Sequence, residues 1–154
     1  MTGSLFGDDP ATPKQAAAKP APVPEETPVH GGFVEVAIPV PLRRLFTYRV
    51  DLKKSALPAK GTRVAVPFAG RKLAGVVVGH RTEAPEGVKR VFSVAGIIEP
   101  TPVFTEELLA FLMRAADYYL HPVGDVLRAA APALPADAMK RLSAAGFLGE
   151  DEVL

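Results

Sequence analysis

The chain has 154 residues, of which 48% are apolar and none is cysteine. This length allows one ordinary hydrophobic core, or one small domain with appendages. No apolar run approaches the roughly 20 residues that cross a bilayer, and the N-terminus lacks the pattern of a signal peptide. Without cysteine there are no disulfides and no cysteine-ligated zinc. We therefore expect a cytoplasmic protein with no membrane contact.

The net charge of +1 conceals an asymmetry along the chain. Residues 33–100 contain 12 Lys and Arg against 5 Asp and Glu, whereas residues 101–154 contain 4 against 8. Residues 1–32 contain 2 against 4. A basic block inside a near-neutral chain indicates a local surface for polyanions. The alternative is that these side chains are simply solvated on exposed strands and loops.

The first 32 residues are rich in Ala and Pro and have almost no large apolar side chains after Phe6. Such a segment cannot bury enough surface to offset the entropy of ordering. We therefore predict a disordered tail over residues 1–32. A folded domain is expected over 33–131, followed over 132–154 by a linker and the start of a second, truncated domain.

Alternating apolar residues predict several short strands after the tail. The predicted strands cover residues 33–38, 46–50, 63–68, 73–80 and 88–98. Gly75 and Gly79 suit a bulge or a bend. Turn signals every 8–12 residues favour a small, mostly antiparallel barrel of the OB type. The fold class is therefore mainly β with α.

Helical patterns follow the predicted barrel. Thr105 is a typical N-cap, and apolar residues recur at helical spacing from Leu108 to Tyr119. Pro122 opens a second short helix that reaches about Ala130. After a proline-containing break, residues 137–145 predict another helix, which Gly146 ends. Two short helices therefore follow the barrel directly.

No catalytic or metal-binding pattern is present in the sequence. The three histidines, His30, His80 and His121, have no ligand spacing, and neither a phosphate loop nor a nucleophile elbow occurs. The acidic pair Glu106-Glu107 is explained by its place in the first turn of a helix. We predict that this chain has no active site and no cofactor.

Two unusual strings remain, at residues 38–48 (IPVPLRRLFTY) and 115–127 (AADYYLHPVGDVL). In the first, Phe46 and Tyr48 are either ordinary core or part of a platform on which nucleic-acid bases stack. Arg43, Arg44 and Arg49 surround Phe46 in sequence and would supply the charge of a basic groove.

The two strings together resemble the beginning of the PriA family of primosomal replication-restart helicases. The resemblance covers residues 33–131 and extends through 154. It implies a small barrel that captures the 3′ end of a nascent strand at a stalled fork, then a winged-helix domain from near Leu134. The ATP-driven helicase lobes and the zinc-binding region of that family have no counterpart in this chain, so zinc and ATP are expected only in those regions.

The resemblance also implies a binding pocket. Phe46 matches the family's phenylalanine, and Thr47 stands where an aspartate is expected. Ala69 occupies the usual place of a glycine, with Gly70 next, and Lys89 matches the family's lysine. The other residues expected to contact DNA are basic: Arg43, Arg44, Arg71, Lys72 and Arg90.

The threonine at position 47 changes the expected chemistry. Like an aspartate, it accepts a hydrogen bond from a terminal 3′-hydroxyl, but it carries no charge. End selectivity is therefore expected to be weaker here, or replaced by general affinity for single strands. The backbone at Ala69 and Gly70 would still approach a terminal nucleotide, since neither residue has a large side chain.

In the second string we expect Tyr118, Tyr119, Pro122 and Gly124 to set how two helices pack on the barrel. The alternative is that the two tyrosines stack on bases. We predict a DNA-binding module, without enzymatic activity, that recognises the 3′ end of the nascent leading strand at stalled or branched forks. It would direct primosome reassembly in the nucleoid.

The expected partners are forks, 3′ ends and single-strand/duplex junctions, with single-strand-binding protein and other primosome proteins as further partners. The rival hypothesis is a protein-interaction barrel. Its basic surface would dock onto a helicase body or onto the acidic tail of a single-strand-binding protein.

Overall fold

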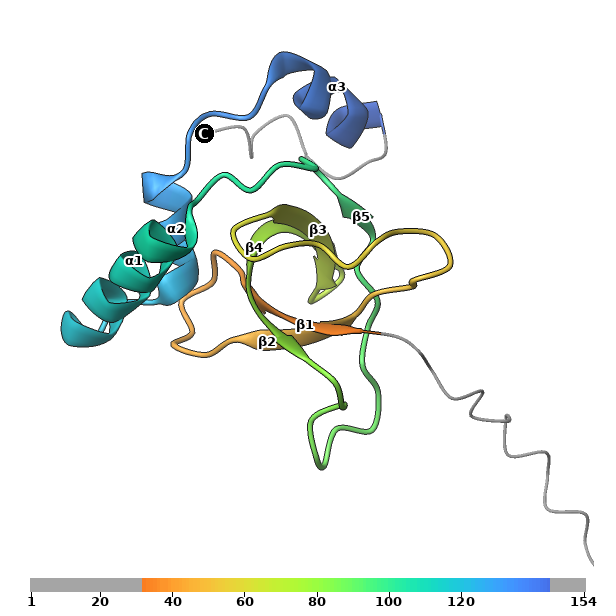
Figure 1. The fold of residues 1–154 in the computed structure, drawn as a ribbon, viewed down its shortest axis with the longest axis horizontal. Helices are drawn as coiled ribbons and strands as arrows, with labels where there is room; N and C mark the ends of the chain where they lie inside the picture. Colours follow the sequence, from red (N-terminus) through yellow and green to blue (C-terminus); the bar gives the residue numbers. More distant parts are fainter. Residues whose placement is uncertain (1–31, 145–154) are drawn as a thin grey trace, which may run out of the picture.

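A five-stranded antiparallel sheet is followed by three helices in this computed structural model, which describes residues 32–144 (Figure 1). The strands are β1 (Phe33–Ala37), β2 (Phe46–Arg49), β3 (Arg63–Phe68), β4 (Arg71–Arg81) and β5 (Gly96–Ile97), and the helices are α1 (Glu106–Tyr118), α2 (Val123–Ala130) and α3 (Ala136–Ala144). The first four strands and all three helices were predicted within two or three residues of these bounds.

A small antiparallel barrel of the OB type was predicted, and the described residues form the antiparallel sheet, open rather than closed, with strand order β2-β1-β4-β3-β5. Its two edges approach each other only through an isolated parallel bridge between Arg49 and Ser93. There the Arg49 amide donates to the Phe92 carbonyl at 2.9 Å, and the Val94 amide donates to the Arg49 carbonyl at 2.8 Å. The sheet therefore curls toward closure without a continuous ladder.

The long last strand predicted over residues 88–98 is also wrong, because only Gly96 and Ile97 form β5. Most of residues 82–95 form an exposed loop instead. Val88 and Phe92 of this loop both have exposed side chains. Alternation of apolar residues specifies a strand only where one face is buried, and this loop has no such face at these two positions. The apolar residues have the spacing of a strand, but within this segment only Gly96 and Ile97 form a ladder.

Strong curvature comes from an irregularity in β4, where the pairing with β1 slips between Glu35–Gly79 and Val36–Val77. One extra residue on β4 makes a bulge, which bends a strand and increases its twist. The prediction of a bulge near the β4 glycines is confirmed at Gly79. Gly75 serves close packing, since a Cβ there would lie 2.4 Å from Val36 Cγ1.

The core inside the curled sheet contains alternate residues of β2 and of the position directly after it. Tyr48 and Val50 are buried in it, and Phe46 packs against it, as the alternation predicted. The Tyr48 hydroxyl donates a hydrogen bond to the Pro67 carbonyl at 3.0 Å. Burial raises the pKa of Tyr48 from 10.0 to about 12, because the charged phenolate would lose its hydration there.

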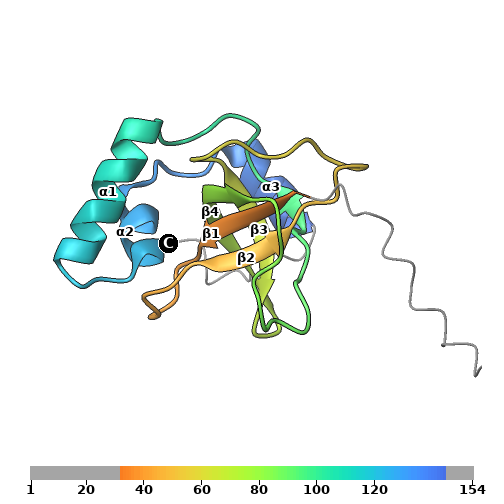
Figure 2. The ribbon, with the colours of Figure 1, turned by 60° about the horizontal axis from the view of Figure 1, so that its bottom comes forward.

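Helices α1 and α2 pack together beside the sheet (Figure 2). The predicted cap is confirmed, since Thr105 Oγ1 accepts a hydrogen bond from the Leu108 amide at 3.3 Å. Gly124, in the first turn of α2, lies against the chain after β1, where a Cβ would be 1.7 Å from the Ile38 carbonyl oxygen. Only glycine allows this approach, so the expected packing role of Gly124 is supported.

The tyrosines of the second string do not pack on the sheet, contrary to expectation. Tyr118 is 80% exposed and Tyr119 is 75% exposed. Their rings contact each other edge to face, with centroids 5.0 Å apart. On α1 the buried face is formed by Leu109 and Ala116, and at 100° per residue Tyr118 lies about 200° from Ala116, while Tyr119 caps the end of the helix. Helix α2 packs on the sheet through Gly124 and the fully buried Leu127.

Helix α3 lies against β3 and the segment after β5, through Ala138 and Leu142, which pack with Ala65 and Ile98. A winged-helix domain is not seen among the described residues. The predicted tail over 1–32, apart from Gly32, lies outside those residues, as does the part of the expected second domain that follows residue 144. No helix within residues 32–144 is long and apolar enough to span a bilayer.

Candidate functional site

Phe46 of β2 contacts Phe68 of β3 at one end of the curled sheet. Its half-buried ring contacts the Phe68 ring edge to face, with centroids 5.1 Å apart and an interplanar angle of 75°. The Arg44 guanidinium lies 4.8 Å from the centroid of the Phe46 ring. A base could reach this ring face only if Arg44 moved, or it could stack on the guanidinium plane itself.

The two-residue turn between β3 and β4 lies directly after Phe68. Ala69 and Gly70 have φ values of 49° and 78°, as a tight hairpin turn with two left-handed residues requires. Both residues are exposed, and a Cβ at Gly70 would meet nothing within 4 Å. The backbone of the turn is thus open to solvent beside the aromatic pair, as the sequence hypothesis requires. We call Phe46, Arg44, Phe68 and this turn the turn cluster.

Thr47 points away from the turn cluster. It pairs with Glu35 on β1, on the face of the sheet opposite to Phe46 and Tyr48. The Glu35 carboxylate is 3.7 Å from the Arg81 guanidinium. The side chains of Phe46 and Thr47 therefore do not share one pocket wall, which adjacency in the sequence could not reveal.

Of the three arginines expected around Phe46, only Arg44 lies there. The Arg43 guanidinium is 3.8 Å from the Asp117 carboxylate of α1. Arg49 lies over the Phe33 ring, 6.0 Å from its centroid. An exposed pair such as Arg43–Asp117 contributes at most about 1 kcal/mol, so Arg43 remains available to an anion at small cost.

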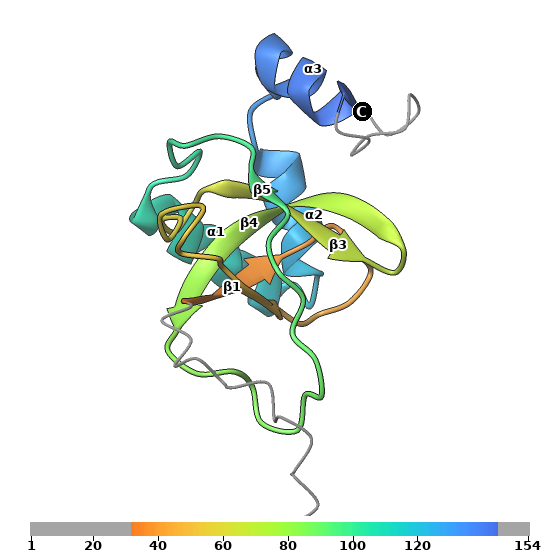
Figure 3. The ribbon, with the colours of Figure 1, turned by 90° about the vertical axis from the view of Figure 1, so that its right-hand side faces the viewer.

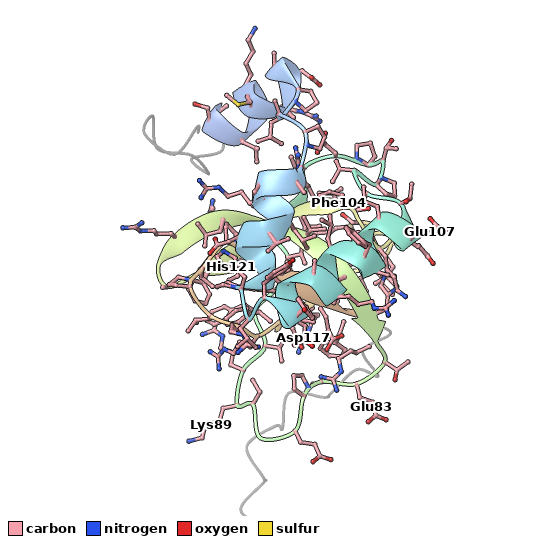
Figure 4. All side chains as sticks on the ribbon, turned by 90° about the vertical axis from the view of Figure 1, so that its left-hand side faces the viewer. Glu83, Lys89, Phe104, Glu107, Asp117 and His121 are labelled. Atoms are coloured by element: carbon pink, nitrogen blue, oxygen red, sulfur yellow. The ribbon has the colours of Figure 1, made fainter. Side chains whose placement is uncertain are left out.

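Lys89 and Arg90 lie on the exposed loop between β4 and β5, where Figure 4 shows Lys89 pointing away from the sheet. This loop follows the end of the 11-residue β4, whereas the turn cluster includes the turn before its start. The Arg90 guanidinium is 5.1 Å from the centroid of the Phe92 ring, which is 52% exposed. We call Lys89, Arg90 and Phe92 the loop cluster.

The predicted site residues thus fall into two groups. Arg71 and Lys72 are the first two residues of β4, are exposed, and directly follow the turn of the turn cluster. Phe92 was missed in the sequence, although its place two residues after Lys89-Arg90 repeats the basic-aromatic pattern of Arg44 and Phe46. The sequence alone does not distinguish the Arg44–Phe46 pair from the Arg90–Phe92 pair.

No group of three or more His, Asp or Glu within residues 32–144 could hold a metal ion. His80 Nε2 lies 2.7 Å from the Pro58 carbonyl oxygen, and His121 is exposed beside the helix corner.

Comparison with known proteins gives one family. Residues 35–132 match the 3′DNA-binding domain (3′BD) of PriA. The chain is 35% identical over 100 residues to the replication restart protein PriA of Haemophilus influenzae, covering 65% of this chain and 13% of that protein. It is 32% identical over 104 residues to the PriA of Bacillus subtilis, covering 66% and 13%. The PriA of Treponema pallidum is 30% identical over 104 residues, covering 65% and 16%.

Proposed function

The chain belongs to the family of PriA 3′ DNA-binding domains, and we propose that it recognises the 3′ end of the nascent leading strand at stalled or branched replication forks. The match over residues 35–132 carries this proposal, because it contains every residue of the turn and loop clusters. Binding would position a replication-restart protein for primosome reassembly in the cytoplasm, at the nucleoid. The chain spans about 13% of the length of the first two relatives compared, so their whole-protein activities are not assigned to it.

Stacking and phosphate contacts would supply the affinity. Phe46 and Arg44 offer an aromatic ring and a guanidinium plane, and each stacked base contributes about 1–3 kcal/mol in single-strand binding. Lys89 and Arg90 would contact phosphates from the loop. Neither kind of contact reads base identity, so we expect affinity to depend strongly on salt and weakly on sequence.

Recognition of the terminal hydroxyl would rely on the turn more than on Thr47. The Thr47 side chain is uncharged and lies on the opposite face from Phe46. The exposed backbone of Ala69 and Gly70 lies next to Phe68 and has no bulky side chain in front of it. We therefore expect this chain to prefer a 3′-hydroxyl, which can hydrogen-bond to the turn backbone, over a 3′-phosphate, which would hold the terminal sugar farther from that backbone.

Fluorescence anisotropy with a labelled fork tests the proposal. The leading arm carries either a 3′-hydroxyl or a 3′-phosphate, and the 154-residue chain is compared with Arg44→Gln and Phe46→Ala. We expect tighter binding to the hydroxyl form, weakened in both variants. Arg44→Gln leaves the core intact, so it separates loss of binding from loss of folding. Equal binding to both ends by the unmodified chain contradicts end recognition.

A second candidate function is protein docking, favoured by a specific feature of α1. Large apolar side chains are exposed along this helix and at its C-terminal end, outside its buried face. They are Leu108, Phe111, Tyr118, Tyr119 and Leu120. Because Glu106, Glu107 and Asp117 lie on the same helix, an acidic tail fits this face poorly and a helicase body fits better. Absence of fork binding at low salt would make docking the leading hypothesis.

A further inference from the structure

Two arginines flank Phe33 on the outer face of the sheet, opposite to the core that contains Tyr48. In the strand register Arg49 of β2 pairs with Phe33 of β1, which also pairs with Arg81 of β4. Paired residues of neighbouring strands project from the same face, so the three side chains form one row. Both arginines are exposed, whereas Phe33 is only 7% exposed, with the Arg49 guanidinium over its ring. The row therefore offers two cations to solvent and almost no aromatic surface.

The row lies at one end of the sheet. Arg81 is the last residue of β4, and the loop that follows it extends away from α3 (Figure 3). Backbone hydrogen bonds of Arg49 hold the far side of this loop next to β2. Helices α1 and α2 cover a different part of the same face, around Ala37 and Val76. The row lies beyond that contact, at the end of the sheet from which the loop projects.

The acids near the row pair with other cations or lie out in solvent. The Glu35 carboxylate is 3.7 Å from the Arg81 guanidinium, and the Asp51 carboxylate is 3.7 Å from the Lys54 amino group. Glu83, on the loop after β4, lies at the outer edge of the molecule (Figure 4). Because the Glu35–Arg81 pair is partly exposed, its stabilising effect is small, and a phosphate can displace Glu35 from Arg81.

Thr47 adds an uncharged hydrogen-bond donor beside Arg49. The two residues are separated by one position on β2, so their side chains share the outer face, about 7 Å apart along the strand. A hydroxyl donates a hydrogen bond to a phosphate without neutralising a neighbouring guanidinium. Thr47 and Arg49 together therefore suit an anion with several acceptor oxygens.

The two faces of the sheet separate this row from the turn cluster. Phe46 packs against the core, whereas Thr47 projects from the outer face. Single-strand sites combine cations with exposed aromatic faces, but the one aromatic ring in the row, Phe33, is buried. Contacts to phosphate without base stacking position a protein on a duplex backbone. The row thus favours duplex over a single strand.

We propose that Thr47, Arg49 and Arg81 form an outer-face site that binds phosphates of the duplex arm of a fork, while the 3′ end occupies the turn cluster. The proposal rests on the proposed function, but each site can fail without the other. Arg49 and Arg81 lie two strand spacings apart, about 10 Å, so both can reach the same backbone. Contacts at two sites on different faces would orient the fork on the domain.

The test measures anisotropy of two labelled DNAs with the 154-residue chain. One is a closed dumbbell duplex of about 20 base pairs, which has no 3′ end, and the other is a single strand of about 12 nucleotides with a 3′-hydroxyl. We expect Arg49→Gln and Arg81→Gln each to weaken dumbbell binding by about 3- to 10-fold and to lower its salt slope by about 0.9. Binding of the single strand should not change.

Position 47 gives a second test of the same site. Thr47→Val removes the hydroxyl at nearly constant size and should weaken dumbbell binding by about 2- to 5-fold. Thr47→Asp places a carboxylate beside Arg49 and should weaken it by about 10-fold or more, because the carboxylate pairs with Arg49 and repels phosphate. Tighter binding of the dumbbell by Thr47→Asp would overturn the proposal.

Two further variants control for folding and charge. Arg114→Gln removes one exposed cation from α1, outside the row, and should match the unmodified chain with both DNAs. Arg49→Lys keeps the charge and should retain most of the affinity for the dumbbell. A loss in Arg49→Gln that Arg114→Gln reproduces would reflect net charge and would overturn the proposal.

The remaining outcomes separate the outer-face site from the end site. Unchanged affinity of Arg49→Gln for the dumbbell, or no dumbbell binding at low salt, overturns the outer-face site alone. An equal loss for the single strand would mean that one strand passes around the β2 edge, and it would overturn the assignment to duplex. If the dumbbell depends on Arg49 but a fork with a 3′-phosphate binds as well as one with a 3′-hydroxyl, end recognition fails and the outer-face site stands.

Discussion

The end of the sheet around Phe46 and the corner between α1 and α2 both contain closely spaced aromatic residues, but they expose them differently. Tyr48 is 3% exposed in the sheet, whereas Tyr118 is 80% exposed at the corner. In a strand, alternation places every second residue in the core, but on a helix adjacent residues differ by 100°. The aromatic residues at the sheet end are part of the core, whereas those at the corner are exposed to solvent.

The two regions are joined by backbone rather than by aromatic packing. Gly124 lies against the Ile38 carbonyl, and Arg43 pairs with Asp117. Thus each unusual string of the sequence contacts the other, although about 70 residues separate them. The glycine fixes the position of α2 against the chain that follows β1.

Truncating the aromatic rings should give the largest contrast between the regions. Tyr48→Ala removes a buried ring and should lower the free energy of unfolding by about 3–5 kcal/mol, whereas Tyr118→Ala should change it by no more than about 0.5 kcal/mol. Urea denaturation followed by circular dichroism measures both. A comparable loss in the two variants would mean that Tyr118 packs against something in the folded chain.

Stability should depend nearly as strongly on Gly124, where the two regions contact each other. Gly124→Ala places a Cβ against the Ile38 carbonyl and should cost about 3 kcal/mol, at the upper end for overpacking. Gly96→Ala is the matched control, because a Cβ there meets nothing within 4 Å. Thermal unfolding of both variants measures the difference. If Gly124→Ala is as stable as the control, α2 does not depend on this approach.

High pH should destabilise the sheet end selectively. Burial raises the pKa of Tyr48 from 10.0 to about 12, so the stabilising effect of its neutral form is fully present below pH 10. Between these values the unfolded chain releases this proton and the folded chain keeps it. The free energy of unfolding should therefore fall by about 2–3 kcal/mol as pH rises from 10 to 12.

Tyr48→Phe isolates that contribution. The variant loses the hydrogen bond to Pro67, at a cost of about 1 kcal/mol near pH 7, but its stability should fall less steeply at alkaline pH. Urea midpoints measured at several pH values in both proteins give the comparison, with Tyr118→Phe as the control at the exposed corner. Parallel curves for Tyr48→Phe and the unmodified chain would contradict the raised pKa.

The smallest effects concern one backbone position in each region. Leu120, after α1, has φ of 54°, and Ala69, in the turn, has φ of 49°. Leu120 completes the helix end, with its amide donating to the Asp117 carbonyl at 3.1 Å and the His121 amide donating to the Ala116 carbonyl at 2.8 Å. Glycine adopts this conformation without strain.

Leu120→Gly should therefore raise the free energy of unfolding by about 0.5–1 kcal/mol, and Ala69→Gly by about 0.5 kcal/mol. Gly70→Ala, with φ of 78°, is the reverse test and should lower it by about 1 kcal/mol. Chemical denaturation resolves changes of this size when the variants are measured side by side. Destabilisation by Leu120→Gly would show that the exposed leucine has a partner in the folded chain.

Sequence patterns predicted most elements but not how the sheet ends. Strands β1 to β4 and the three helices follow from alternation, from the Thr105 cap and from Pro122. The segment 88–98 has the same composition as a strand, yet only Gly96 and Ile97 form one, and Ser93 adds a single isolated bridge to Arg49. A strand needs a free edge in register, and that depends on how far the curled sheet has turned, which local pattern does not encode.

The candidate site was predicted in part. The resemblance brought Phe46, Ala69 and Gly70 to attention, and they do lie together through Phe68. It could not show that Thr47 lies on the other face, that Arg43 pairs with Asp117, or that Phe92 accompanies Arg90 on the loop. The role of every predicted site residue in binding DNA stays a prediction until the experiments above are done.

The sequence by itself determined which residues alternate, where helices begin and which family the two strings resemble, because these depend on short-range spacing and on residue type. The tertiary structure alone decided which of those residues meet. Curvature at the β4 bulge brings Phe46 to Phe68, and the absent Cβ of Gly124 lets α2 approach Ile38 and face the hairpin. Such contacts depend on the path of the whole chain in space, so no local pattern could specify them.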